Sequence, residues 1–260
     1  MDITSDSHSQ HISRQFNQEL EELKTHLMAM GGLVEKQVQD AVFALLEGDT
    51  RLAEQVRDND RQVNDLQLQI DDECTRVLAR RQPAASDLRL VLAVIRATSD
   101  LERIGDEASK IARNALLLSE STSTIRGLVE VRHISEHVRK MLRDALTAFA
   151  RFDTDLAMQV VREDELVDDE YSSAMRSLMT FMMEDSRSIT SVLSIMWVLR
   201  ALERVGDHAD NLAEYVVYLV KGLDIRHSDP DNLDPQVLKS LDLKGVSSCN
   251  TSRLLSGLDV

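Results

Sequence analysis

Glycine and proline are scarce in this chain, which has 9 glycines and 3 prolines among 260 residues. Sandwiches and barrels need many tight turns, and such turns depend on these two residue types, so an all-β fold is disfavoured. No proline occurs between Pro83 and Pro230, so nothing in that stretch interrupts a helix by removing a backbone donor. The scarcity therefore favours long helices.

Cysteine is equally rare, and Cys74 and Cys249 lie far apart in the sequence. This spacing predicts neither a disulfide framework nor a cysteine metal site, and a reducing cytoplasm is the simplest setting. No apolar run reaches the roughly 18 residues that a membrane-spanning helix needs. The polar N-terminus lacks the features of a signal peptide. We expect a soluble cytoplasmic protein with no direct membrane insertion.

Positive charge is also in short supply, with 30 Lys and Arg against 45 Asp and Glu and a formal net charge of −15. A nucleic-acid-binding protein usually presents a basic face, so that class is disfavoured. The 43% of hydrophobic residues is nevertheless enough to bury a sizeable core.

Apolar residues recur at spacings of three and four, which is typical of helices packed in a bundle. The pattern predicts a first helix that ends at Gly48, a second that Asp49 or Thr50 caps, and a break at Pro83. The inward positions of the first helix are Leu20, Leu23, Leu27, Met30, Val34, Val38, Ala41 and Leu45.

A third helix is expected to start with Ser86 or Asp87 as its cap. Trp197, on a later and otherwise apolar stretch, is predicted to lie in the core. The inward positions of the third helix are Leu88, Leu92, Ile95, Leu101, Ile104, Ala108, Ile111 and Ala115.

The sequence then repeats itself. Asp49-Thr50 recurs as Asp153-Thr154, and the stretch LERIGD that begins at Leu101 recurs as LERVGD from Leu202. The short connections imply antiparallel neighbours. We predict an all-α fold, a tandem duplication of an antiparallel three-helix bundle with six long helices. The predicted units are 10–122, 123–222 and a mostly irregular tail, 223–260, with one short helix near 236–243.

The duplicated E-R-[IV]-G-D motif carries the most chemistry. Glu102 and Asp106 lie four residues apart, as do Glu203 and Asp207, and Asp210 extends the second row. Like charges at this spacing destabilise a helix, and a multivalent cation would reverse that effect. We expect the carboxylates to form an acidic stripe beside the apolar face. The alternative is a solvated charged face with local arginine partners.

The glycine inside each motif costs helix stability, so Gly105 and Gly206 predict the close approach of another helix or of a bound cluster. If the second and third helices fold back about Pro83, Glu102 to Asp106 lie opposite Asp60 to Asn64. The corresponding acids of the second unit are Asp164 and Asp168. Asp60, Asp164 and Asp168 are therefore further candidate ligands, with a plain acidic helix face as the alternative.

Two other features have competing interpretations. His133 and His137 fit an H-x-x-E-H pattern, but the first unit has Ala29 and Leu33 in their places, so a structural role is favoured. The turn after the second helix gathers three arginines near one end of an acidic protein. These arginines are Arg80, Arg81 and Arg89. Their positive charges either offset the negative end of a helix dipole or form a contact patch for an acidic partner.

The stretches ARRQPAASDLR, DLERIGDEASKIA and ALERVGDHADNLAE give the chain a resemblance to the PhoU family of bacterial phosphate-transport accessory proteins. The resemblance covers roughly residues 10–225. It implies a dimeric protein of paired three-helix bundles whose acidic motifs bind metal clusters of iron or zinc. The preference of carboxylate oxygens for hard cations makes Mg or Mn the alternatives. The implied ligands are Glu102, Asp106, Glu203, Asp207 and Asp210. In the first unit, Ser109 occupies the position that corresponds to Asp210.

The resemblance also implies a function without enzymatic activity. Members act as negative regulators of the phosphate-starvation response, restrain phosphate uptake, and link the ATPase subunit of the phosphate ABC transporter to a membrane sensor histidine kinase. The chain would then be cytoplasmic and recruited to membrane-bound partners. A carboxylate-bridged metalloenzyme and a metal-storage bundle are the alternatives.

Overall fold

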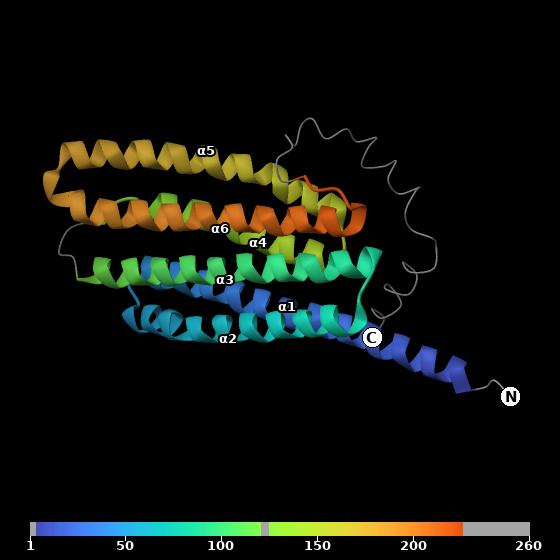
Figure 1. Cartoon of the computed structure of the whole chain (residues 1–260). Coiled ribbons are helices and arrows are strands. Elements are labelled where there is room, and N and C mark those ends of the chain that lie inside the picture. The colour runs from blue at the N-terminus through green and yellow to red at the C-terminus, as the bar shows by residue number, and fades with distance from the viewer. Residues whose placement is uncertain (1–3, 121–124, 226–260) are drawn as a thin grey trace.

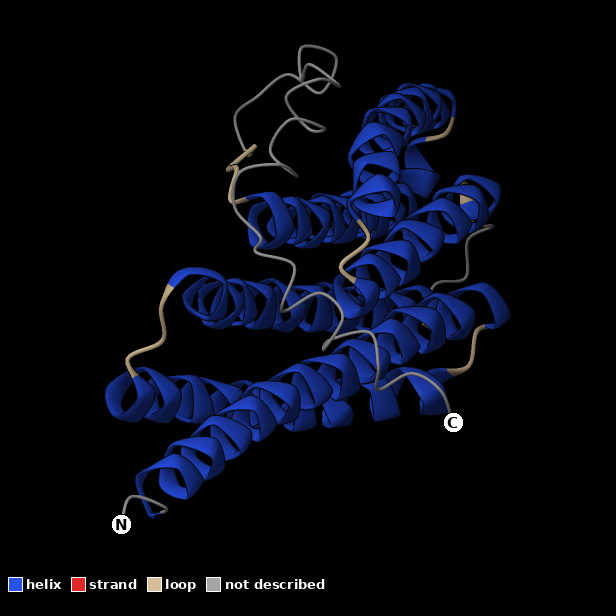
Figure 2. Ribbon diagram, turned by 90° about the vertical axis from the view of Figure 1, so that its right-hand side faces the viewer, coloured by secondary structure: helices blue, strands red, loops and turns tan. Residues whose placement is uncertain are grey.

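The computed structural model describes residues 4–120 and 125–225. The predicted tail beyond residue 225, with its expected short helix, and Cys249 lie outside this range. The described residues form six long helices and one short 3-10 turn and contain no strand, so the all-α prediction is confirmed (Figure 2). The elements are α1 (Thr4–Glu47), α2 (Thr50–Arg81), α3 (Ala85–Ser119), α4 (Leu128–Arg151), α5 (Thr154–Glu184), η1 (Ser186–Ser188) and α6 (Ile189–Lys221).

The α3 and α6 helices lie side by side at the centre, with α2 and α5 on their outer sides and α1 and α4 behind (Figure 1). Glu107 of α3 pairs with Arg204 of α6, and Asp100 contacts His208 and Tyr215. Residue numbers thus fall along one helix as they rise along the other, so α3 and α6 are antiparallel. The two helical units meet chiefly through this central pair and through α1 against α4.

Of the two residues predicted as possible caps of the second helix, Asp49 is the one that caps it, and Asp153 does the same in the second unit. The Asp49 carboxylate accepts a hydrogen bond of 3.0 Å from the Leu52 amide, and the Asp153 carboxylate accepts one of the same length from the Leu156 amide. Before each cap the chain takes the left-handed conformation, at Gly48 with a φ of 70° and at Phe152 with a φ of 56°. The same local chemistry therefore starts α2 and α5.

The predicted inward stripe of α1 is buried along its whole length. Two predictions for α3 are wrong at its first turn: the N-cap is Ala84, which makes no side-chain cap bond, and Leu88 is 37% exposed. The helix starts directly after the Pro83 turn, before Ser86 and Asp87, and its first turn projects beyond the apolar cluster that buries Val91 and Val94.

The prediction that Trp197 is a core residue is also wrong, because its side chain is 65% exposed. The α6 helix contacts α3, α4 and α5, and these contacts bury the adjacent Val198 and Leu199. One strip of α6 is left without a neighbouring helix, and Trp197 lies on it. None of the helices in the described ranges combines the length and apolarity that a membrane-spanning segment requires.

Candidate metal centre

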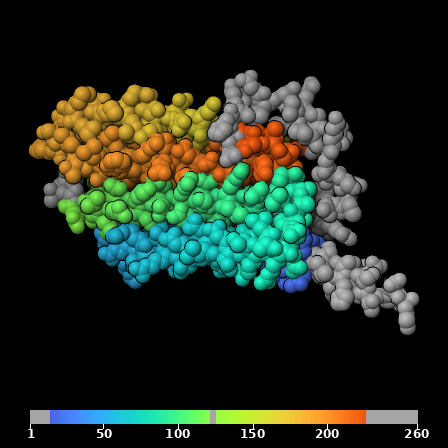
Figure 3. All heavy atoms as spheres, viewed as in Figure 1, coloured from blue at the N-terminus to red at the C-terminus, as the bar shows by residue number. Residues whose placement is uncertain are grey.

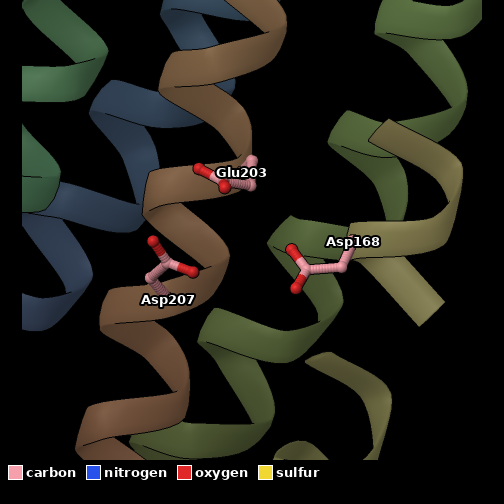
Figure 4. A group of neighbouring side chains, drawn as sticks. All are labelled: Asp168, Glu203 and Asp207. Atoms are coloured by element: carbon pink, nitrogen blue, oxygen red, sulfur yellow. The ribbon is translucent and has the colours of Figure 1, made fainter. Parts of the chain in front are cut away.

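Three predicted ligands meet in the seam between α5 and α6. Asp168 comes from α5, and Glu203 and Asp207 come from successive turns of α6 (Figure 4). One carboxylate oxygen from each residue lies within 4.8 Å of the other two. An oxygen-only donor set of this kind suits hard and borderline cations such as Mg²⁺, Mn²⁺ and iron.

The motif glycines let the neighbouring helix come close to these carboxylates. A Cβ atom on Gly206 would lie 3.6 Å from an Asp164 oxygen and from Val167, and one on Gly105 would lie 3.7 Å from an Asp60 oxygen and 3.4 Å from Val63. The fold therefore pairs the E-R-[IV]-G-D turn with the expected acid of the preceding helix in both units. At these distances a Cβ atom would be in ordinary van der Waals contact, so alanine would fit at either position and only a longer side chain would have to displace Asp164 or Asp60.

The electrostatics of the second unit show crowded negative charge. Burial raises the pKa of Glu203 to about 7, with a further contribution from Asp207. Burial raises the pKa of Asp164 to about 6, and the charges of Asp207 and Asp168 add to it. Burial, Glu214 and Asp164 raise the pKa of Asp210 to about 8, and burial and Asp168 raise that of Asp207. These carboxylates ionise reluctantly, and a nearby cation would favour their charged forms.

Unpartnered oxygens support the fit of a cation. Arg200 pairs with one oxygen of Glu203, but the other, Oε2, is buried without a hydrogen-bond partner. Oδ1 of Asp210 is buried in the same way. Buried carboxylate oxygens are normally hydrogen-bonded or bound to metal. Glu203 is itself only 8% exposed, so the expected stripe beside the apolar face is in part inside the protein.

The acids of the first unit are less tightly gathered. Burial, with a contribution from Asp106, raises the pKa values of both Asp60 and Glu102. Among the described side chains of residues 14–120, however, no three potential ligands have atoms within 4.8 Å of one another. Ser109 occupies the place that Asp210 has in the second unit. The structure thus makes the second unit the stronger candidate.

Two of the three turn arginines make contacts within the chain. Arg81 donates to both carboxylate oxygens of Glu19, at 2.6 and 2.9 Å, and Arg89 donates to the Leu219 carbonyl at 3.2 Å. Arg80 is exposed. The patch therefore ties α2 to α1 and α3 to the end of α6, and Arg80 is the member with the freest access to a partner.

Sequence reasoning missed a hollow in the seam between α3 and α6. It is lined by Trp197, four basic side chains and few others, with a volume of about 300 Å³. The one available signal was the row of Trp197, Arg200 and Arg204, which share a helix face at spacings of three and four. The basic lining consists of Lys110, Arg113, Arg200 and Arg204.

The model of the PhoU domain matches this chain twice, over residues 27–115 and 131–216. The chain belongs to the PhoU family. It is 60% identical over 225 residues to a phosphate-specific transport system accessory protein PhoU homolog of Pseudomonas putida, covering 86% of this chain and 88% of that protein. It is 47% identical over 227 residues to the PhoU accessory protein of Escherichia coli K12, covering 87% and 93%.

Solved structures of PhoU proteins have the same fold. The crystal structure of PhoU from Pseudomonas aeruginosa superposes with a TM-score of 0.79 at 60% identity, covering 80% of this chain and all of that one. The phosphate transport system regulatory protein PhoU from Streptococcus pneumoniae gives a TM-score of 0.74 at 31% identity, covering 80% and 98%. The family matches are centred on the two helical units that carry the acidic motifs.

Proposed function

We propose that this PhoU-family protein is a non-enzymatic regulatory adaptor of phosphate transport. It links the ATPase subunit of the phosphate ABC transporter to a sensor histidine kinase, restrains phosphate uptake and represses the phosphate-starvation response as a homodimer. The names of its relatives support the accessory and regulatory part. An adaptor of this kind must bind one signalling state of a partner more tightly than the other.

The observation that carries the adaptor role is the Trp197 groove. A tryptophan that is 65% exposed is unusual on a soluble surface and is typical of the centre of a binding interface. Four basic side chains line the groove, although the whole chain carries a net charge of −15. Glu107 pairs with Lys110 and Arg204, and Glu203 pairs with Arg200, so two acidic residues stand against four basic ones. The charge and the indole together fit an acidic partner segment that carries an apolar side chain.

The duplication explains why the groove is hollow. The related position at the other end of the α3–α6 seam is filled by Asp100 and Tyr215, whose side chains are 2.7 Å apart. In the groove the equivalent residues are Ala201 and Asn114, which are smaller. Ala201 and Asn114 are too small to fill the space that Asp100 and Tyr215 fill at the other end of the seam, so a hollow remains. The helices that line the groove, α3 and α6, lie side by side in Figure 3.

Replacing Trp197 by alanine is expected to weaken binding to a purified partner, the sensor kinase or the ATPase subunit, by at least about tenfold. Stability should change little, since the side chain is mostly exposed. Met183→Ala, at a side chain that is 81% exposed on α5, is the matched control and should bind normally. Binding is measured by titration calorimetry against each partner separately. Unchanged affinity for both partners would remove the groove from the adaptor proposal.

The regulatory role itself is tested by deleting the gene and growing cells in excess phosphate. Loss of repression should raise alkaline phosphatase activity, and expression of the wild-type chain should restore repression. A strain that stays repressed would contradict the proposal. Complementation with Glu203→Gln, Asp207→Asn then asks whether the carboxylates matter to signalling, because a variant that still represses would separate metal binding from the adaptor role.

We also propose that Asp168, Glu203 and Asp207 hold a divalent cation, with Asp164 and Asp210 close enough to share its charge. The oxygen-only set favours Mn²⁺, Mg²⁺ or iron over zinc. When bound, the ion would neutralise the crowded carboxylates. Glu102, Asp106 and Asp60 would form a weaker counterpart in the first unit. The proposed role of the metal is to stabilise the α5–α6 seam.

A further inference from the structure

A second cluster of potential ligands lies in the seam between α4 and α5, away from the acidic motifs. Nε2 of His133 is 3.2 Å from Oε1 of Glu170, and Nδ1 of His137 is 3.4 Å from the same oxygen. The two histidines are four residues apart on α4, so they share one face of that helix. The structure thus supplies the partner carboxylate that sequence reasoning did not find for the histidines.

We propose that His133, His137 and Glu170 form a zinc site. Two imidazoles and a carboxylate, with water as the fourth ligand, are a common donor set for zinc. The ligand atoms of a tetrahedral zinc ion with bonds of about 2.1 Å lie about 3.4 Å apart. The two nitrogen–oxygen distances here, 3.2 and 3.4 Å, already match that spacing. This inference goes beyond the adaptor function and does not depend on it.

One adjustment completes the site. The Glu170 oxygen lies between the two imidazoles, whose nitrogens are more than 4.8 Å apart, so His133 must turn toward His137 for both nitrogens to reach one ion. The His133 side chain is 69% exposed and has room to turn. His137 and Glu170 are 20% and 27% exposed, so they are held in place while remaining accessible to an ion from solvent.

The duplicated unit provides an internal comparison. At the three equivalent positions the first unit has Ala29, Leu33 and Leu66, and the two leucines pack against the apolar core. All three positions carry ligand-type residues in the second unit. An ordinary ion pair needs only one base and one acid, as with Lys140 and Glu163 two turns along the same seam, where the distance is 2.7 Å, so it does not require the second imidazole. The joint presence of two imidazoles and a carboxylate favours a metal.

The site is separate from the acidic centre. Asp168 reaches toward α6, whereas Glu170, two residues further along α5, reaches toward α4. The chemistry differs as well, because imidazole nitrogens select zinc over Mg²⁺ and Mn²⁺. The two centres should therefore respond to different metals and to different substitutions.

The test is a Zn²⁺ titration of the metal-free full chain in competition with a chromophoric chelator. His137→Gln and His133→Gln are each expected to weaken binding of one zinc ion by at least about tenfold. His26→Gln is the matched control, because His26 also contacts a carboxylate, Glu73 at 2.7 Å, but has only one imidazole. It should bind zinc as the wild type does, and so should Glu203→Gln.

Imidazole proton spectra supply a second measurement. Zinc should shift the resonances of His133 and His137, which the two variants identify, at one equivalent of metal. Wild-type zinc affinity in both His133→Gln and His137→Gln would overturn the proposal. It would also be overturned if Glu203→Gln, and not the histidine variants, lost the ion, because the zinc would then lie in the acidic centre.

Discussion

Replacing Asp210 by asparagine is expected to stabilise the metal-free protein at pH 8 by about 1–3 kcal/mol. Burial together with Glu214 and Asp164 raises the pKa of this carboxyl to about 8, and its Oδ1 atom is buried without a partner. In the folded protein this carboxyl must therefore either keep its proton at pH 8 or be buried as a charged group, and both cost stability. Asparagine has the same shape and does not ionise.

The effect depends on pH with a definite sign. A carboxyl whose pKa is higher in the native state binds more protons there than in the unfolded chain, so stability falls as pH rises between the two pKa values. For Asp210 that window runs from about 4 in the unfolded chain to about 8 in the native one. The stability advantage of Asp210→Asn should thus be small at pH 4.5 and grow toward pH 8.

Urea unfolding in the presence of a metal chelator measures the free energies of unfolding of the wild type and of Asp210→Asn at pH 4.5 and at pH 8. Asp72→Asn is the control, since the Asp72 side chain is 69% exposed and pairs only with Arg76 on its own helix. A lower stability of Asp210→Asn at both pH values would show that its charge is stabilising, contrary to the burial argument. Added Mn²⁺ should then stabilise the wild type more than the variant, if Asp210 contributes charge to the proposed cation.

Replacing Asp100 by alanine is expected to destabilise the protein by about 2–4 kcal/mol. This carboxylate is only 3% exposed and joins the two units across the α3–α6 seam. It accepts a hydrogen bond of 2.7 Å from the Tyr215 hydroxyl, and its other oxygen lies 2.9 Å from Nδ1 of His208 and 3.4 Å from the Asn211 amide nitrogen. The alanine variant would remove this acceptor from Tyr215 and His208, which are both buried.

Urea unfolding at pH 7 measures the loss, with Asp72→Ala as the exposed control that should change stability by less than about 0.5 kcal/mol. Asp100→Asn keeps an acceptor for Tyr215 and should be intermediate. If the alanine variant were as stable as the wild type, the network would not hold the units together. A biphasic transition in Asp100→Ala would instead indicate that the two units unfold separately once the seam is weakened.

Much of the helical architecture was predictable because it depends on neighbours in the sequence. Asp49 and Asp153 cap their helices through amides three residues away. The stripe from Leu20 to Leu45 is buried because its spacing matches one helix face. The first turn of α3 was mispredicted because the Pro83 turn, and not a capping side chain, sets where that helix begins.

The acidic centre was predictable only in part. The motif spacing placed Glu203 and Asp207 on one face, and the fold-back about the second turn placed α5 opposite them. Which acids of that stretch converge depends on the rotation of α5 about its axis, which no single-helix pattern contains. Asp168 joins the oxygens of Glu203 and Asp207, while Glu170 turns to α4.

By itself, the sequence determined the all-α fold, the breaks between the first three helices, the internal duplication and the pairing of each glycine motif with an acidic helix. These features follow from spacing and local hydrogen bonding. Only the tertiary structure decided that Trp197 is exposed, that Asp100 is buried against Tyr215, and that Glu170 meets two histidines. The reason is that burial and convergence depend on which helix covers which face, and residues more than 30 positions apart along the chain set that arrangement.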